Sequence, residues 1–126
     1  MLQFINPLLH KALQSISPCQ LCNVEQQQIH SVCADCWQQL PWLKSTVQRQ
    51  EMEIHSACHY DYPIDRIIQK FKYEQQLHFQ QLLAGALMQL RLPKIQAIVP
   101  MPISNQRLAE RGYNQSLVLG KILAKQ

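Results

Sequence analysis

The stretch CQLCNVEQQQIHSVCADC, residues 19–36, decides how the front of this chain folds, because it holds two CxxC pairs separated by a short loop. Each pair lets two sulfurs of one tight turn approach a single metal ion, and two such turns supply the four thiolates that zinc takes in a tetrahedral site. We therefore expect a Zn²⁺ ion to be bound by four ligands: Cys19, Cys22, Cys33 and Cys36. Four thiolates leave no position for water, so this zinc is predicted to be structural.

Other interpretations of the cysteines stay open at this point. Two disulfides are disfavoured in a reducing compartment, and a single redox pair would leave the other pair without a role. His30 lies between the pairs and could compete as a ligand. The fifth cysteine, Cys58, could be a further ligand or a nucleophile, but a free cysteine is more commonly a small core residue.

The composition is that of a folded protein with a mild excess of positive charge. The chain has 126 residues, of which 47% are apolar and 16% charged, and a net charge of +4. This length allows a small metal-binding module followed by one modest unit, and the charge is compatible with an acidic partner such as phosphate, nucleotide or nucleic acid. The sequence has neither the roughly 18 continuous apolar residues of a membrane span nor a recognisable signal peptide, so we expect a cytoplasmic protein.

Hydrophobic patterning predicts a front module over residues 1–43 and an α/β unit over residues 53–126, joined by a polar linker. Helices are expected at these places: residues 4–16, a short helix ending near Leu40, a helix opened by Pro63, residues 77–92, and a last helix capped by Asn114. A strand is expected over residues 53–61, with Ile54, Cys58 and Tyr60 on one face. The apolar run IQAIVP, residues 95–100, is typical of a strand buried on both faces of a parallel sheet.

The segment PMPISNQRLAERGYN, residues 100–114, carries the strongest functional signal. Arg107 and Arg111 can fork onto phosphate oxygens, Gly112 permits a close backbone approach, and the helix that follows offers free N–H groups at its first turn. The segment therefore predicts an anion site. A solvated basic loop with Asn114 as an ordinary helix cap is the open alternative.

Four motifs together resemble the ComF family: the two CxxC pairs, IIQKFKYEQQ at residues 67–76, VPMP at 99–102 and RGYNQ at 111–115. The resemblance implies a zinc ribbon followed by a type I phosphoribosyltransferase-like, Rossmann-like domain, linked in several bacteria to DNA uptake during natural transformation. It also implies a loop that contacts pyrophosphate. The residues that match this region are Val99, Pro100, Met101, Pro102, Arg107, Arg111, Asn114 and Gln115, together with Lys72 and Tyr73 of the KY pair.

The sequence departs from the family pattern in one large respect. It contains no DD-x-x-T-T-G motif, which in the family binds the 5-phosphate of phosphoribosyl diphosphate. We therefore expect a truncated member, inactive as a transferase, with Mg²⁺ and phosphoribosyl diphosphate relevant only to a full-length relative. Tyr113 in place of the commoner phenylalanine is a smaller change.

Two functions are compatible with these observations. The first is that of a phosphoribosyltransferase-related protein. The second is that of a zinc-ribbon module which binds single-stranded DNA or a protein of the uptake machinery. In the second case Trp37 and Trp42 would stack on bases, whereas in the first they would pack against the small metal core.

Overall fold

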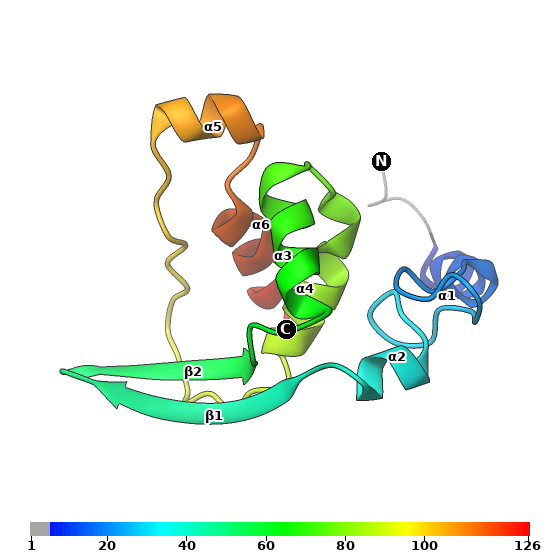
Figure 1. Cartoon of the computed structure of the whole chain (residues 1–126), viewed down its shortest axis with the longest axis horizontal. Helices are drawn as coiled ribbons and strands as arrows, with labels where there is room; N and C mark the ends of the chain where they lie inside the picture. Colours follow the sequence, from blue (N-terminus) through cyan, green and yellow to red (C-terminus); the bar gives the residue numbers. More distant parts are fainter. Residues whose placement is uncertain (1–5) are drawn as a thin grey trace. The chain divides into compact units, whose positions relative to one another are not determined.

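The computed structural model describes residues 6–126, which divide after Gln39 into two compact units (Figure 1). The first unit holds α1 (Pro7–Ile16), a looped segment with the four clustered cysteines, and α2 (Ala34–Gln38). Pro7 occupies the first turn of α1, where its missing N–H costs nothing. The expected beginning of this helix near Phe4 lies outside the described residues.

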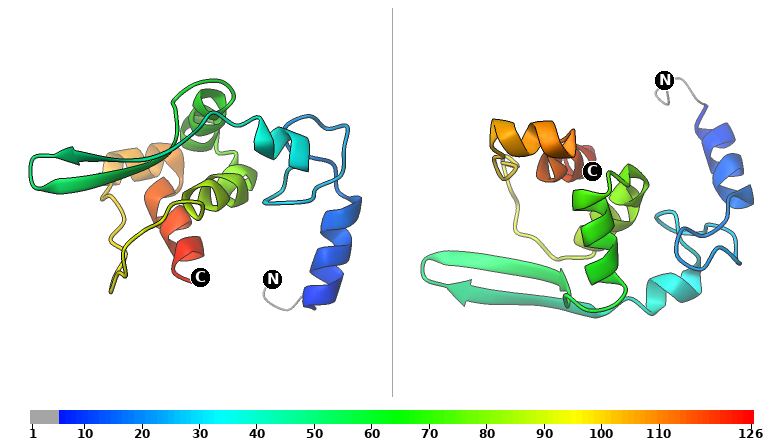
Figure 2. Two further views of the ribbon diagram at one scale, coloured as in Figure 1. Left: turned by 90° about the horizontal axis from the view of Figure 1, so that it is seen from below. Right: turned by 45° about the horizontal axis from the view of Figure 1, so that its top comes forward.

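The second unit begins with an antiparallel hairpin of β1 (Trp42–Arg49) and β2 (Met52–Cys58). The helical elements that follow are α3 (Ile64–Tyr73), the 3₁₀ turn η2 (Leu77–Phe79), α4 (Gln80–Leu87), α5 (Asn105–Arg111) and α6 (Gln115–Leu123). An extended segment leads from α4 to α5, and Figure 2 shows it as a long stretch of chain without helix or strand between the two. The unit is thus a mixed α/β structure, with a two-stranded sheet among the described residues.

The core of this unit is helical. Buried side chains come from the inner face of α3, with Ile64, Ile67 and Phe71, and from α4, where Leu82 is fully buried. Phe79 of η2 is also buried. The predicted helix over residues 77–92 is shorter than expected, because the chain turns after Leu87 and ends its hydrogen-bonded turns before Pro93.

The predicted linker at residues 44–51 is wrong, because β1 occupies most of it. Thr46 pairs with His55 and Val47 with Ile54 in the hairpin register. Polar residues suited a linker from sequence alone, but one face of a two-stranded hairpin is open to water and tolerates them.

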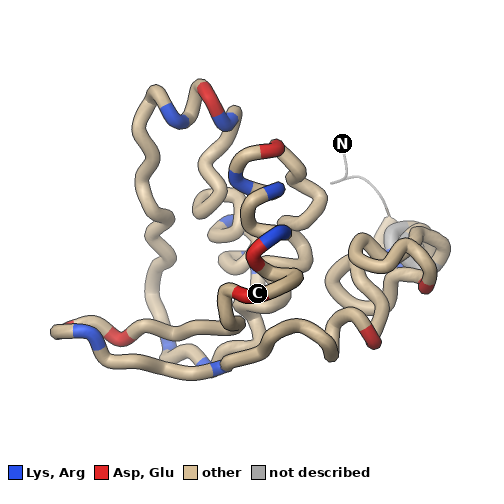
Figure 3. Tube along the Cα trace, viewed as in Figure 1, with Lys and Arg blue, Asp and Glu red and all other residues tan. Residues whose placement is uncertain are grey.

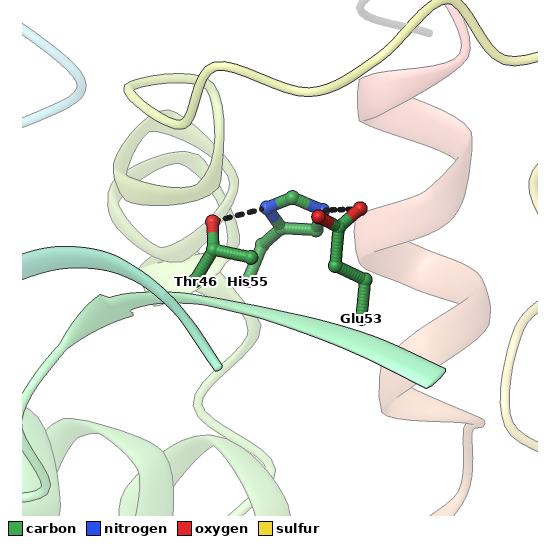
Figure 4. A network of polar contacts seen from close by, with 3 residues as sticks. All are labelled: Thr46, Glu53 and His55. Carbon is green, nitrogen blue, oxygen red and sulfur yellow. Dashed lines mark hydrogen bonds and ion pairs between the residues drawn. The ribbon is translucent and has the colours of Figure 1, made fainter. Parts of the chain in front are cut away.

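The predicted inner face of the second strand is also wrong. Ala57 is buried and the His55 side chain is only 18% exposed, whereas Ile54 and Tyr60 are exposed. His55 is held by Thr46 Oγ1, 2.9 Å from its Nδ1, and by Glu53 Oε2, 3.5 Å from its Nε2 (Figure 4). The pairing of β1 with β2 places these three side chains on one face of the hairpin. His55, and not Ile54, is therefore the residue shielded from solvent.

The expected strand at residues 95–100 is absent, and its side chains, such as Ile95 and Val99, are exposed. A strand needs a neighbour to take its backbone N–H and C=O groups, and no described strand pairs with this segment. The helix α5 follows instead, with Ser104 as its N-cap, in a segment whose sequence favours a loop. No helix among residues 6–126 has the length and apolar character needed to cross a membrane.

Candidate metal centre and anion pocket

The four cysteines of the CxxC pairs converge on one point. Their Sγ atoms all lie within 4.8 Å of one another, and those of Cys22 and Cys33 are 3.9 Å apart. Zinc with Zn–S bonds of about 2.3 Å requires sulfurs about 3.8 Å apart in a tetrahedron. The cluster therefore has the donor set and the spacing to hold a metal ion, as predicted.

Local backbone structure brings the two pairs together. The loop between them folds back through short bridges that pair Pro18 with Gln26 and Ile29 with Val32, and Val32 is fully buried beneath them. In the first turn, Leu21 N lies 3.4 Å from Cys19 Sγ. In the second, Cys33 is the N-cap of α2 and its sulfur accepts from Cys36 N at 3.5 Å. Such N–H···S contacts orient sulfurs for a metal and stabilise their thiolate form.

The pKa values of two clustered thiols, Cys22 and Cys36, are shifted in opposite directions. Hydrogen bonds from the backbone of Glu25 and Val24 lower the pKa of Cys22 to about 6. Burial raises the pKa of Cys36, and the neighbouring cysteines add to this. A bound dication would favour the thiolate at every position, since a metal reverses the local cost of gathering negative charge.

The structure also bears on the alternative interpretations of the cysteine segment, namely disulfides and His30 or Cys58 as a further ligand. All five cysteines are free thiols, and the described metal-ligand cluster comprises neither His30 nor Cys58. His30 packs instead against Trp37, with ring centroids 5.0 Å apart, and burial lowers its pKa. Cys58 lies half-buried at the end of β2.

A second feature is a pocket of about 590 Å³ in the second unit. Its lining residues come from the end of α3, from the segment before α5, from α5 itself, and from Asn114 and the first turn of α6. Those that the sequence analysis had singled out are Lys72, Tyr73, Met101, Pro102, Arg107, Arg111, Asn114 and Gln115. Figure 3 shows Lys and Arg positions on both α3 and α5.

Three candidates lie outside the pocket lining. Val99 is 87% exposed and Pro100 precedes the lining residues, so the loop contributes from Met101 onward. Gly112 has a φ of 82° and ends α5 in a left-handed conformation, with its N–H bonded to Leu108 O. Its role in this structure is to turn the chain from α5 into α6.

Sequence reasoning missed three lining residues, Ile103, Ser104 and Ser116. Ser104 could have been found, because its hydroxyl accepts from Arg107 N at 3.2 Å, the usual bond of a serine N-cap. Nothing in the pattern marked Ile103 or Ser116, whose positions depend on how the chain packs.

A four-cysteine cluster with the spacing to hold a metal ion, followed by a mixed α/β unit with a basic pocket, defines an α/β protein with a candidate metal centre. The particular likeness is to Competence protein F of Haemophilus influenzae (strain ATCC 51907 / DSM 11121 / KW20 / Rd), with 31% identity over a match that covers 91% of this chain. This similarity confirms the resemblance to the ComF family that the motifs predicted. The chain spans 50% of the length of that relative. No family model and no solved structure matches.

Proposed function

We propose that this chain is a competence-related protein of ComF type, with a structural zinc module in front of a phosphate-binding pocket. Support comes from its likeness to Competence protein F together with the convergence of Lys72, Arg107 and Arg111 on one pocket. That convergence carries the proposal, because the KY and RGYNQ motifs lie far apart in sequence. We place the protein in the reducing cytoplasm, where the cysteines stay available as ligands.

The metal in this proposal is zinc. Four sulfur donors favour a soft or borderline ion, and zinc has no geometric preference that the cluster would have to satisfy beyond a tetrahedron. Cys19 and Cys33 are buried while Cys22 is exposed, so the ion would lie at the edge of the small core beside Val32. Zinc bound there would order the first unit and supply no reaction chemistry.

The pocket suits a phosphate group. Its charged lining residues among those described are all basic, and they combine two guanidinium groups with one ammonium group. Arg can bind two oxygens at once and Lys acts as a point charge. Ser104, Ser116 and Asn114 add polar groups that can donate to the remaining oxygens.

We infer further that the pocket corresponds to the pyrophosphate half of a phosphoribosyl diphosphate site. The 126 residues carry no DD-x-x-T-T-G loop for the 5-phosphate, so the complete substrate would gain nothing over pyrophosphate alone. Transferase activity is accordingly not expected from this chain by itself. Mg²⁺ and phosphoribosyl diphosphate would serve a longer relative.

Titration of the chain with Mg²⁺ and either phosphoribosyl diphosphate or inorganic pyrophosphate tests this inference. Both ligands should shift the amide signals of residues 101–116 at similar, millimolar concentrations. Micromolar binding of phosphoribosyl diphosphate, with a clear preference over pyrophosphate, would show that the chain supplies the 5-phosphate contact after all.

The competing function is binding of single-stranded DNA or a partner of the uptake machinery by the zinc module. In that function the Trp37 ring would stack on bases. The ring already packs against His30, which favours the phosphate pocket over DNA binding by the zinc module. A fluorescence titration with an oligonucleotide distinguishes the two. Quenching that weakens steeply with salt would support the DNA-binding module, and an unchanged signal would remove it.

A further inference from the structure

The C-terminal end of α3 lies beside the basic pocket. A helix C-terminus is an unfavourable neighbour for an anion. The last four carbonyls of a helix lack partners within the helix and carry its partial negative charge. Lys72 and Tyr73, the last two residues of α3, both line the pocket. Bare carbonyls at this place would repel the phosphate that the basic side chains attract.

Three of these four carbonyls, those of Lys70, Phe71 and Lys72, accept hydrogen bonds, and two of the three accept from the distant RGYNQ motif. Lys70 O accepts from Glu74 N at 3.0 Å within the local turn. Phe71 O accepts from the Tyr113 hydroxyl. Lys72 O accepts from Gln115 Nε2 at 3.1 Å, across 43 residues of sequence.

Gln115 has a second contact through the other end of its side chain. Its Oε1 accepts from Arg111 Nη1 at 3.1 Å, and the Arg111 guanidinium also lies over the Tyr73 ring at 5.1 Å. Gln115 is only 7% exposed, and a buried amide is stable only when its donor and acceptor are both used. One carboxamide therefore ties an arginine of the pocket to the end of α3.

We propose that Gln115 is the positioning residue of the pocket. It removes the Lys72 carbonyl from the anion's surroundings and fixes the Arg111 guanidinium toward the space where the anion binds. Tyr113 does the first of these at the neighbouring carbonyl. This inference rests on the proposed phosphate pocket for its ligand, but the order of Arg111 can be measured with no ligand present.

The test uses the full chain with Gln115→Met, and Gln106→Met as the matched control. Gln106 lies on α5 outside the pocket lining, and its amide donates to Glu110 on the same helix at 3.3 Å. Two quantities are measured by NMR: the heteronuclear NOE of the Arg111 Nε–Hε group, and the affinity for inorganic pyrophosphate. Gln115→Met should lower the NOE and weaken pyrophosphate binding on the order of tenfold, the range of a lost hydrogen bond to a charged group. Gln106→Met should change neither.

A second variant separates the two contacts and serves if Gln115→Met unfolds. Gln115→Glu keeps an acceptor for Arg111 but cannot donate to Lys72 O, and it adds a negative charge. Arg111 should stay ordered in this variant while pyrophosphate binding is lost. Wild-type affinity in Gln115→Glu, or an unchanged Arg111 NOE in folded Gln115→Met, would overturn the positioning role. If wild-type protein shows no pyrophosphate binding but Arg111 loosens in Gln115→Met, the phosphate pocket fails and the hold on Arg111 stands.

Discussion

Asn114 donates its side-chain amide to the carbonyl of Met101 over 3.1 Å, while its Oδ1 accepts from Leu117 N over 3.3 Å. One residue thus caps α6 and holds the segment before α5 against it. This double contact explains why the second half of the VPMP motif and part of the RGYNQ motif line one pocket, although most of α5 lies between them along the chain. Asparagine suits the position because its short side chain carries both a donor and an acceptor.

Replacing Asn114 should separate these two contacts. Asn114→Ala removes both, and we expect the free energy of unfolding to fall by about 1 kcal/mol from the lost cap alone. Asn114→Asp keeps the cap acceptor and should retain most of that stability, but it cannot donate to Met101 O. Urea unfolding of the three proteins measures the difference. Equal losses for both variants would mean that the cap contributes nothing.

The helical core should tolerate truncation poorly at Leu82. This side chain is fully buried in α4, so Leu82→Ala should lower the free energy of unfolding by about 2–5 kcal/mol through the cavity it leaves. Leu108→Ala on α5 is the control, since that leucine is 40% exposed. The two are compared by denaturant titration. Similar losses at both positions would contradict the placement of the core on α3 and α4.

Cys58 should be a slow nucleophile at neutral pH. Burial raises the pKa of its thiol above the ordinary value, and the charge of Lys44 offsets this only in part. A raised pKa means less thiolate below that value, so the alkylation rate should still be climbing at pH 9, about tenfold for each pH unit. Iodoacetamide labelling with mass spectrometry measures the rate on metal-loaded protein, and Cys58→Ser identifies the site. A rate that reaches a plateau near neutral pH would contradict the burial.

Arg111 should carry much of the attraction for phosphate. We expect Arg111→Ala to weaken pyrophosphate binding by at least an order of magnitude, the range for a charge-assisted contact. It should also lower the free energy of unfolding by about 1–3 kcal/mol, because the Oε1 atom of the buried Gln115 loses its donor. Arg49→Ala at the end of β1 removes the same charge from an exposed site outside the pocket lining. If the two variants lose affinity equally, net charge and not the pocket would explain the binding.

The metal cluster and the helices other than α5 could be predicted from sequence because their signals are local. CxxC spacing fixes sulfurs within one turn, and the periodicity of Ile64, Ile67 and Phe71 describes one helix face without reference to the rest of the chain. The cap at Asn114 follows from its side chain alone, and the structure shows it.

The parts that sequence reasoning got wrong depend on partners. The apolar run at residues 95–100 has the composition of a buried strand, yet it forms no strand because no described strand pairs with it. The polar residues of β1 suggested a linker until their pairing with β2 gave them a partner. The contacts of Gln115 could not be predicted, since Lys72 is far away in sequence and only packing brings the two together.

Metal analysis of the purified chain tests the central claim most directly. Protein expressed in rich medium and measured by elemental analysis should contain one zinc ion per chain and no disulfide. Cys33→Ser should lose the ion and Cys58→Ser should keep it, because Cys58 lies outside the cluster. Metal-free protein whose four cysteines are joined in disulfides, or a chain that keeps its zinc in Cys33→Ser, would contradict the four-thiolate site.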